Sequence, residues 1–397
     1  MLAKTILSIL ASTLLVSTSL AQEAFVSTDG ATFTLGGSKF YFEGTNAYYL
    51  MNSAQSDVQE LFKQASSAKL PVVRTWLFNS GSDDVWFQKW DKSSNKMIIN
   101  DDDDTGLGRM DYVLQQAAKN NVKVIFAFTN NWVDYGGMDY YTQNMGGKYH
   151  DDFYTNQDII DAYKAYIEHV LNRKNSLTGK AYKDDPTIFG WELANEPRCE
   201  GGGSLQKSSK CNTDTITQWA DDISTYIKSI DKNHLVAVGD EGFFNDASSS
   251  DWAYNGGSGI DFDALIALKN IDFGTFHLYP DSWNENPDSW ATKWIKDHIS
   301  SQNDAGKPVI MEEYGVSADL RASVYPSWQK TVEDGDLAAD AFWQLAVPCN
   351  PDLDEFALCS SDDDFGTIIG EHASAMASKV SINASVDLCT RRMAINF

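Results

Sequence analysis

The chain has 397 residues and a formal net charge of −25, with 31 Lys and Arg against 56 Asp and Glu. This acidic excess argues against nucleic acid or anionic lipid as a partner, because a basic surface is hard to build from these residues, and it suits a neutral polymer better. The 12 Trp and 17 Tyr are expected mostly in the core, although aromatic faces also serve as platforms for sugars.

The first 21 residues are predicted to form a secretory signal peptide. Lys4 supplies a short positive start, residues 6–16 are apolar with small hydroxyl interruptions, and Ser19 and Ala21 occupy the two positions that a signal peptidase reads. Cleavage after Ala21 would leave residues 22–397 as a secreted, extracellular chain. A membrane anchor is the alternative, but the apolar run is too short to span a bilayer, so no membrane association is expected.

Eight short apolar runs, rich in β-branched and aromatic residues, alternate with stretches of helical period along the rest of the chain. This alternation is typical of a parallel sheet with helical crossovers, and eight such units predict an α/β fold, a closed (β/α)₈ TIM barrel that forms a single domain over residues 22–397. The predicted strands are Tyr41–Thr45, Val72–Leu77, Val122–Phe128, Ile188–Leu193, Leu235–Val238, Phe273–Leu278, Val309–Glu313 and Ala341–Leu345.

Helices are predicted between these strands, at Asp57–Ala65, Arg109–Asn120, Gln157–Arg173, Asp214–Ile230, Asp288–Ala305 and Tyr325–Glu333. In the last of these, Pro326 is placed in the first helical turn, where its missing N–H costs least. A further helix is expected near Gly370–Val380, and residues 22–39 are expected to form a small hairpin that caps the bottom of the barrel.

The five cysteines point to disulfides, which are the default in a secreted chain. Local pairing would join Cys199 to Cys211 and Cys349 to Cys359 and leave Cys389 free, although other pairings remain open. Neither Cys nor His spacing suggests zinc. The acidic run 101–104 lacks the Gly and the distal Glu of an EF-hand loop, so no metal and no other cofactor is expected.

In a (β/α)₈ barrel the active site forms at the C-terminal ends of the strands. Polar and aromatic residues are concentrated at these predicted ends, so we expect them to meet at one rim of the barrel. They are Arg74, Trp76, Asn79, Asn130, Asn131, Trp132, Asn195, Glu196, Asp240, Glu241, His277, Tyr279, Glu313 and Trp343.

Two of these residues suggest glycoside hydrolysis, which usually needs two carboxylic acids around the scissile bond. Glu196 fits the general acid/base, whose pKa must be raised before it can donate a proton, and a neighbouring carboxylate can raise it by repulsion. Glu313 fits the nucleophile, which must be ionised, with Arg74 as its partner. A surface charge is the ordinary alternative for each Glu, but two such residues closing separate strands favour a functional role.

The neighbouring residues are interpreted by strand parity. Adjacent strand residues point to opposite faces, so only one of Glu312 and Glu313 is expected to enter the site. Glu192 lies inside its strand and is expected in a buried polar network. His277 and Tyr279 share parity, and we expect His277 to bind a sugar hydroxyl and Tyr279 the nucleophile.

The chain resembles glycoside hydrolase family 5, and within it the fungal and plant endo-β-1,4-mannanases. The resemblance rests on segments at the predicted strand ends, among which Asn-Glu-Pro-Arg-Cys and His-Leu-Tyr-Pro-Asp-Ser-Trp are the most specific to mannanases. The matching segments are Val73–Trp76, Thr129–Trp132, Trp191–Cys199, Thr275–Trp283 and Glu312–Gly315.

The resemblance implies a retaining mechanism with Glu196 as acid/base and Glu313 as nucleophile. It also implies that Arg198 touches sugar on the leaving-group side and that Trp132 and Trp283 are further sugar contacts. The residues that match the active-site shell of the family are Arg74, Asn195, His277, Tyr279 and Trp343. The cysteine positions depart from those expected of filamentous-fungal relatives, so no pairing is carried over.

The expected activity is therefore that of a secreted endo-β-1,4-mannanase, a monomer that acts on mannan, glucomannan, galactomannan and manno-oligosaccharides without a cofactor. A β-glucanase of the same fold is the nearest alternative, and a non-catalytic secreted glycan-binding protein is an alternative from another class. The presence of both Glu196 and Glu313 argues against the second alternative.

Overall fold

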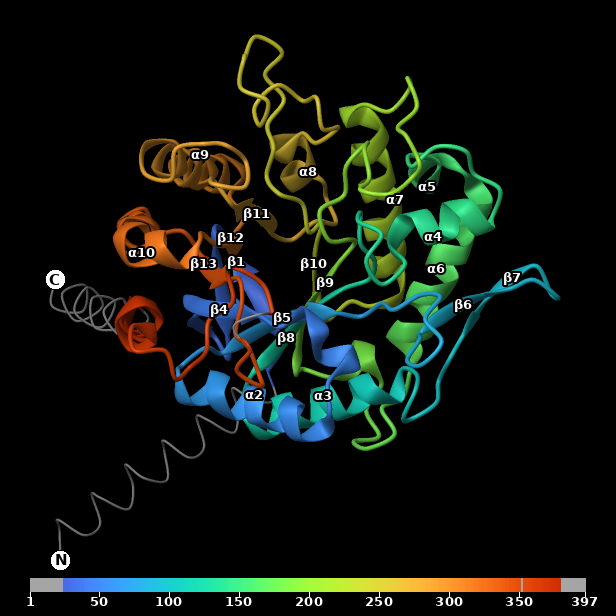
Figure 1. Ribbon diagram of the computed structural model, residues 1–397, viewed down its shortest axis with the longest axis horizontal. Helices are drawn as coiled ribbons and strands as arrows, with labels where there is room; N and C mark the ends of the chain where they lie inside the picture. The colour runs from blue at the N-terminus through green and yellow to red at the C-terminus, as the bar shows by residue number, and fades with distance from the viewer. Residues whose placement is uncertain (1–23, 351–352, 380–397) are drawn as a thin grey trace, which may run out of the picture.

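A computed structural model describes residues 24–350 and 353–379 of the chain. Within these residues eight parallel strands form one sheet that curls into a barrel with helices around it (Figure 1). The predicted (β/α)₈ architecture is confirmed. The spatial order is β10 (Leu235–Ala237), β9 (Ile188–Glu192), β8 (Lys123–Ala127), β5 (Val72–Trp76), β4 (Phe42–Asn46), β13 (Ala339–Phe342), β12 (Val309–Tyr314) and β11 (Gly274–Leu278).

The first and last strands of this order, β10 and β11, meet to close the barrel. The backbone N–H of Asp272 donates to the carbonyl of Val236 at 2.8 Å, and the Asp272 carboxylate accepts from the Val236 N–H at 2.8 Å. Nearer the other end of the strands, the N–H of His277 donates to the carbonyl of Glu241 at 3.2 Å. These bonds place the residues that follow β10 beside β11 at the rim of the barrel.

The predicted helices are present, with ends that differ by a few residues from the sequence-based bounds. The described helices are η1 (Tyr48–Asn52), α2 (Gln55–Ser67), α3 (Gly108–Lys119), α4 (Gly137–Asn144), α5 (Asp152–Thr155), α6 (Gln157–Asn172), η2 (Tyr182–Asp184), α7 (Thr213–Ile230), α8 (Phe262–Ala267), α9 (Ser289–Ala305), α10 (Ala318–Asp334) and the π-helical turn η3 (Gly366–Gly370). A helix continues over residues 371–379, where one was expected.

The prediction for Pro326 is wrong. Helix α10 begins at Ala318, so Pro326 lies in its interior rather than in its first turn. The buried face of α10 extends back past Pro326 to Val324 and Arg321. Burial of this face outweighs the loss of one helical hydrogen bond at a proline, which has no N–H to donate.

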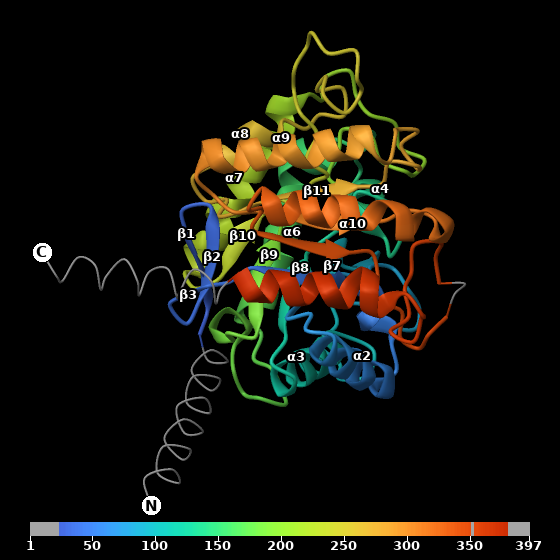
Figure 2. The same cartoon turned by 90° about the vertical axis from the view of Figure 1, so that its left-hand side faces the viewer.

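A small antiparallel sheet covers the N-terminal ends of the barrel strands (Figure 2). It consists of β1 (Val26–Asp29), β2 (Thr32–Leu35) and β3 (Ser38–Lys39). Phe33 of β2 is fully buried and packs on the rings of Phe189 and Phe273 at centroid distances of 5.1 and 5.5 Å. The expected cap is confirmed for residues 24–39. A second hairpin, β6 (Gln88–Asp91) with β7 (Lys96–Ile99), follows β5 and was not predicted.

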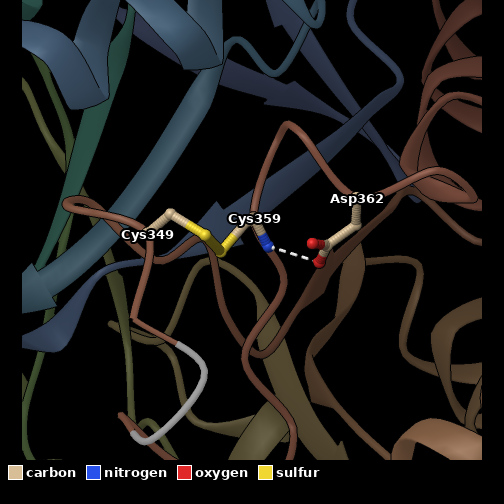
Figure 3. Close-up of side chains that lie close together, drawn as sticks. All are labelled: Cys349, Cys359 and Asp362. Carbon is tan, nitrogen blue, oxygen red and sulfur yellow. Dashed lines mark hydrogen bonds between the residues drawn. A yellow bond between two sulfur atoms is a disulfide. The ribbon is translucent and has the colours of Figure 1, made fainter.

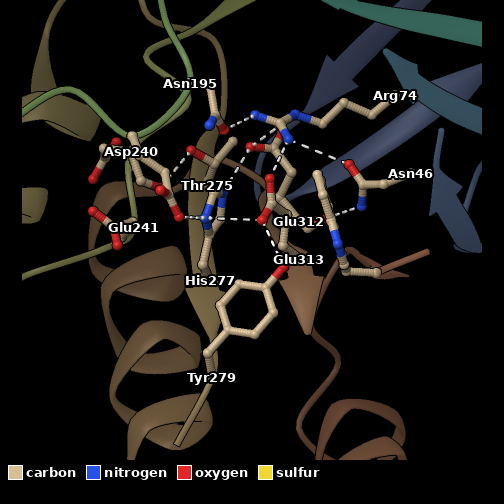
Figure 4. Close-up of polar contacts among 12 residues, drawn as sticks. Asn46, Arg74, Asn195, Asp240, Glu241, Thr275, His277, Tyr279, Glu312 and Glu313 are labelled. Carbon is tan, nitrogen blue, oxygen red and sulfur yellow. Dashed lines mark hydrogen bonds and ion pairs between the residues drawn. The ribbon is translucent and has the colours of Figure 1, made fainter. Parts of the chain in front are cut away.

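Strand β12 contains an irregularity that decides which side chains reach the site. Its pairing with β11 runs from Met311 opposite Phe276 directly to Glu313 opposite His277, so Glu312 is an extra residue at a bulge. A bulge breaks the alternation of faces on which parity arguments rest. The side chains of Glu312 and Glu313 both point toward the barrel interior, so the parity argument fails here, although of the two only Glu313 lines the cavity at the strand ends (Figure 4).

Both predicted disulfides are present among the described residues. Cys199 is bonded to Cys211, and Cys349 to Cys359 beside Asp362, whose carboxylate accepts the Cys359 N–H at 2.8 Å (Figure 3). The Ala21 cleavage point and Cys389 lie outside the described residues. A search of the described residues for a helix with the length and apolar character of a membrane span found none.

Candidate active site

A cavity of about 600 Å³ opens at the C-terminal ends of the barrel strands. Most of the predicted site residues line it, namely Trp76, Trp132, Asn195, Glu196, Arg198, Tyr279, Trp283, Glu313 and Trp343. The strand ends therefore converge as the sequence predicts. Arg74, His277 and Asn131 are buried beneath or behind this lining.

The two candidate carboxylic acids approach each other across the cavity. A carboxylate oxygen of Glu196, a ring nitrogen of His277 and a carboxylate oxygen of Glu313 all lie within 4.8 Å of one another. Glu196 follows β9 with φ of 52°, in the left-handed region that residues other than Gly rarely adopt. Its N–H donates to the Gly239 carbonyl at 2.8 Å, so the neighbouring strand holds this strained conformation at a functional position.

Glu313 is held from two sides. Its Oε1 forms an ion pair with Nη1 of Arg74, and its Oε2 accepts a hydrogen bond from the Tyr279 hydroxyl at 2.7 Å (Figure 4). Both contacts were expected. Burial raises the pKa of Glu313, the positive charges of His277 and Arg74 lower it, and Glu196 raises it again, so that the pKa of Glu313 lies above its ordinary value.

Arg74 ties the carboxylates under the cavity together. Its Nε lies 2.8 Å from Glu192 Oε2 and 3.4 Å from Glu312 Oε2, while its Nη2 donates to Asn195 Oδ1 at 2.8 Å. Since its side chain is 1% exposed, Arg74 orients the carboxylates rather than touching the contents of the cavity. The expected buried network around Glu192 is confirmed.

Glu192 and Glu312 share the space beneath Arg74, and their pKa values are shifted in opposite directions. Burial, Glu312 and a hydrogen bond between the two carboxyls raise the pKa of Glu192 well above its ordinary value, against the attraction of Arg74. Burial also raises the pKa of Glu312, but Arg74, the hydrogen bond with Glu192 and His277 lower it below that value. Of the two carboxyls, Glu192 therefore binds a proton more tightly than Glu312.

His277 bridges this lower layer and the cavity. Its Nδ1 lies 2.7 Å from Glu196 Oε1 and 3.4 Å from Glu313 Oε2, and its Nε2 lies 3.4 Å from Glu312 Oε2. Burial lowers the pKa of His277, but these carboxylates raise it well above the ordinary value, so the ring is an imidazolium. Because carboxylates occupy both ring nitrogens, the expectation that His277 binds a sugar hydroxyl is wrong.

The pKa of Glu196 is shifted in the direction opposite to the one expected from the sequence. Burial raises its pKa, but the hydrogen bond and charge of His277, the charge of Arg198 and a hydrogen bond from Trp132 together lower it to about 2. The sequence suggested only repulsion from Glu313. It gave no sign that an imidazolium would stand between the two carboxylates.

Arg198 extends the site beyond Glu196. Its guanidinium is paired with Glu241 and lies over the rings of Trp132 and Phe243, 5.3 and 4.9 Å from their centroids. Glu241, which was expected at this rim, thus fixes the direction of Arg198. Burial raises the pKa of Glu241 to about 7, although Arg198 acts in the opposite direction.

Asn131 does not belong to the cavity lining. Its side chain is fully buried, where Oδ1 accepts the Arg198 N–H at 3.1 Å and contacts His150 Nε2 at 2.9 Å. Asn131 was expected at the rim of the barrel, but the turn after β8 directs the preceding residue, Asn130, into the cavity instead. Asn131 anchors the backbone that carries Arg198.

One wall of the cavity comes from residues that the sequence did not single out. Tyr48 stacks on Trp343 with a centroid distance of 5.5 Å and an interplanar angle of 2°, and Asp354 accepts the Trp343 Nε1–H at 3.0 Å. Tyr48 begins η1 just after β4, and Asp354 lies in the loop that follows β13, so neither was among the residues expected at the predicted strand ends. Tyr135 and Phe356 complete this wall.

Comparisons with known proteins find the same kind of enzyme in each case. Residues 23–346 match the model of the family described as GH family 5 beta-mannosidase-like. A probable mannan endo-1,4-beta-mannosidase C of Aspergillus terreus is 41% identical over 355 residues, which cover 81% of this chain and 83% of that protein. A mannan endo-1,4-beta-mannosidase A of Aspergillus aculeatus is 37% identical over 90% of this chain and 92% of its own.

Solved structures give the same picture. The endo-1,4-beta-mannanase of Rhizomucor miehei is 65% identical, with a TM-score of 0.88, over 89% of this chain and all of that chain. An endo-beta-1,4-mannanase of Thermotoga petrophila is 34% identical, with a TM-score of 0.76, over 85% of this chain and 77% of that one. Both similarities extend over the barrel and its rim.

Proposed function

This chain belongs to the β-mannosidase-like enzymes of glycoside hydrolase family 5 and is an endo-1,4-β-mannanase of the retaining type, and from this premise we propose that Glu313 is its nucleophile and Glu196 its acid/base. One observation carries the assignment. The two carboxylates have oxygens within 4.8 Å of each other, near the separation of about 5–5.5 Å that suits double displacement and too short to admit the water of an inverting enzyme.

In the first step Glu313 attacks the anomeric carbon while the glycosidic oxygen leaves with a proton from Glu196. Arg74 and Tyr279 hold both oxygens of Glu313 and so fix its direction of attack. The product of this step is a mannosyl ester of Glu313. In the second step Glu196 takes a proton from water, the water attacks the same carbon, and Glu313 is released.

The proton for the first step has a defined origin in this proposal. In the free enzyme Glu196 is ionised, and the proton in its hydrogen bond lies on His277 Nδ1, 2.7 Å away. Transfer of this proton along the hydrogen bond neutralises both groups and leaves Glu196 protonated, so that it can donate to the leaving oxygen. His277 is thus a positioning and proton-holding residue that acts through Glu196.

The two sides of the cavity are assigned to the two parts of the sugar chain. Trp343, Trp76 and Tyr48 form an aromatic wall near Glu313 that suits the sugar undergoing attack. Arg198 and Trp132 adjoin Glu196 and suit the leaving part of the chain. The substrates are β-1,4-mannans, including glucomannan and galactomannan, and manno-oligosaccharides.

The enzyme is also proposed to be secreted and to act as a monomer. The disulfides Cys199–Cys211 and Cys349–Cys359 suit an oxidising compartment, and residues 1–21 have the composition of a signal peptide. Sequencing of the N-terminus of the exported chain tests cleavage after Ala21. Light scattering of the purified chain tests the monomer.

The function is tested by reducing-end release from galactomannan, carboxymethyl-cellulose and laminarin with the purified enzyme. Release from galactomannan alone supports the substrate assignment, and an α-configured first product in an NMR time course would contradict retention at a β-linkage. Release from a glucan instead would keep the mechanism and replace the substrate class.

A further inference from the structure

An exposed tryptophan, Trp252, stands outside the cavity in the loop between β10 and α8 (Figure 1, the yellow segment beside α8). It is 36% exposed, although a large apolar ring normally gains by burial. The loop that carries it folds back on itself, because the Phe244 N–H donates to the Ala253 carbonyl at 2.9 Å and the Asp246 N–H to the Tyr254 carbonyl at 2.6 Å.

Side chains on both sides of Trp252 hold this loop against helix α9. Tyr254 stacks on Phe244 at a centroid distance of 5.3 Å, and its hydroxyl donates to Asp297 Oδ2 at 2.6 Å. Asp251 accepts the Trp290 Nε1–H at 2.8 Å. The indole of Trp252 is therefore presented to solvent by a fixed backbone, which lowers the entropy cost of binding a partner there.

Trp252 is continuous with the leaving-group side of the active site. Its ring centroid lies 5.8 Å from that of Trp283, which lines the cavity, with the two planes at 89°. It also lies 4.9 Å from the ring of Phe243, on which the Arg198 guanidinium rests at 4.9 Å. Aromatic and guanidinium groups thus run without a break from Glu196 outward to Trp252.

We propose that Trp252 is a distal sugar-binding platform, against which a mannosyl residue of the leaving part of the chain stacks beyond Trp283. An enzyme that cuts inside a polymer has substrate on both sides of the cleavage point, and chain that leaves the cavity past Trp283 passes over this ring. The flat apolar face matches the C–H face of a pyranose, and the carboxylate of Glu285, which accepts a hydrogen bond from the Trp252 side chain, has further lone pairs for sugar hydroxyls. This inference rests on the proposed function and adds a binding site to it.

The test is kcat/KM for linear manno-oligosaccharides from mannotriose to mannohexaose, measured for the wild type, Trp252→Ala and Trp252→Phe. The matched control is Leu177→Ala, since Leu177 is 49% exposed and lies between α6 and η2, at the opposite end of the barrel. Cleavage positions in mannohexaose are read by mass spectrometry after labelling of the reducing end. Melting temperatures are recorded for every variant.

Trp252→Ala is expected to lower kcat/KM about fivefold for mannohexaose, the size of one lost aromatic contact, and to leave mannotriose within about twofold of the wild type. Its cleavage of mannohexaose moves toward products with fewer sugars on the leaving side, while Trp252→Phe keeps most of the wild-type preference. An equal loss at every chain length, or no loss with mannohexaose, would overturn the platform. A wild type that cleaves none of these substrates would instead overturn the proposed function.

Discussion

The Nδ1 atom of His277 lies 2.7 Å from Oε1 of Glu196, so that a buried imidazolium, and not solvent, is the first hydrogen-bond partner of the proposed acid/base. The contact explains why the pKa of Glu196 is low in the free enzyme. It also makes the protonation of Glu196 depend on residues that do not touch the sugar.

Replacement of His277 by Gln is expected to raise the pKa of Glu196, because it removes the positive charge that stabilises the carboxylate. Because the proton used in the first step is held on His277, whose pKa lies well above its ordinary value, the alkaline limb of the kcat/KM profile should move to lower pH, where Glu196 alone loses its proton, and kcat should fall roughly 100-fold. A pH–rate profile checks this. His169→Gln, at an exposed ion pair with Asp101, is the control, and limbs that stay in place in His277→Gln would count against the account.

Glu312 and Glu313 are adjacent in sequence but have different roles, so replacing each by Gln should lower kcat by different factors. Glu313→Gln removes the nucleophile and is expected to lower kcat by roughly 10⁴-fold or more. Glu312→Gln shifts Arg74 and His277 and is expected to cost about 100-fold, the effect of a misplaced catalytic group. Rates on a mannan with matched melting curves decide this, and equal losses in the two variants would contradict the assignment.

Glu192 and Glu312, the two carboxyls beneath Arg74, should respond differently to replacement by Gln. Because the pKa of Glu192 is raised and that of Glu312 is lowered, Glu192→Gln is expected to replace a neutral group and Glu312→Gln to remove a charge. The limbs of the pH–rate profile should therefore move in Glu312→Gln and stay near their wild-type positions in Glu192→Gln. This difference is expected even if the maximal rate of both variants falls. A protonated-carboxyl infrared band that is lost in Glu192→Gln would support this directly. The opposite pattern of shifts would place the proton on Glu312.

A buried histidine outside the site makes stability depend on pH. His372, in the helix over 371–379, contacts Asp340 at 2.8 Å and Glu333 at 2.7 Å. Burial lowers its pKa, but Asp340 and Glu43 raise it, and the result is a pKa of about 11. Since this value exceeds the ordinary 6.5, the proton stabilises the folded state fully below pH 6.5, and the effect is lost as the pH rises toward 11.

His372→Gln should therefore lower the melting temperature most near pH 6, and the difference from the wild type should shrink steadily between pH 7 and pH 10. Thermal unfolding at several pH values across this window is the measurement. A difference that is constant with pH would mean that His372 contributes by packing alone.

The disulfide Cys199–Cys211 should support substrate binding as well as stability. Cys199 follows Arg198 directly. Because the disulfide restricts the unfolded chain, it is expected to stabilise the folded state by about 2–4 kcal/mol. The double variant Cys199→Ser/Cys211→Ser is expected to melt at lower temperature and to raise KM for long manno-oligosaccharides more than it lowers kcat. Kinetics measured below the melting temperature of the variant test this. An unchanged KM would mean that the disulfide-closed loop does not contribute to substrate binding.

Much of the barrel could be predicted from sequence because each strand is a short apolar run and each strand end carries its polar residues. Glu196, Glu313 and Tyr279 were found by this rule alone. The argument from strand parity failed at Glu312, because a bulge cannot be recognised from the alternation that it interrupts. The prediction of a helix start failed at Pro326, where packing of a long helix overrides the local preference of proline for the first turn.

The rest of the site depends on contacts between segments that are distant in the chain. Tyr48 reaches the cavity from the start of η1 and Asp354 from the loop after β13, and both contact Trp343. The charge of Glu196 is set by His277, which lies 81 residues away in sequence. Such electrostatic relationships follow from the assembled barrel and leave no local pattern.

The most direct test of the central claim is to trap the covalent intermediate with a 2-deoxy-2-fluoro-mannosyl donor that carries a good leaving group, followed by peptide mass spectrometry. The account predicts one sugar per chain, attached to Glu313 and absent from the Glu313→Gln variant. A label on Glu312 or on another residue, or an active enzyme that cannot be labelled and releases product of inverted configuration, would contradict it.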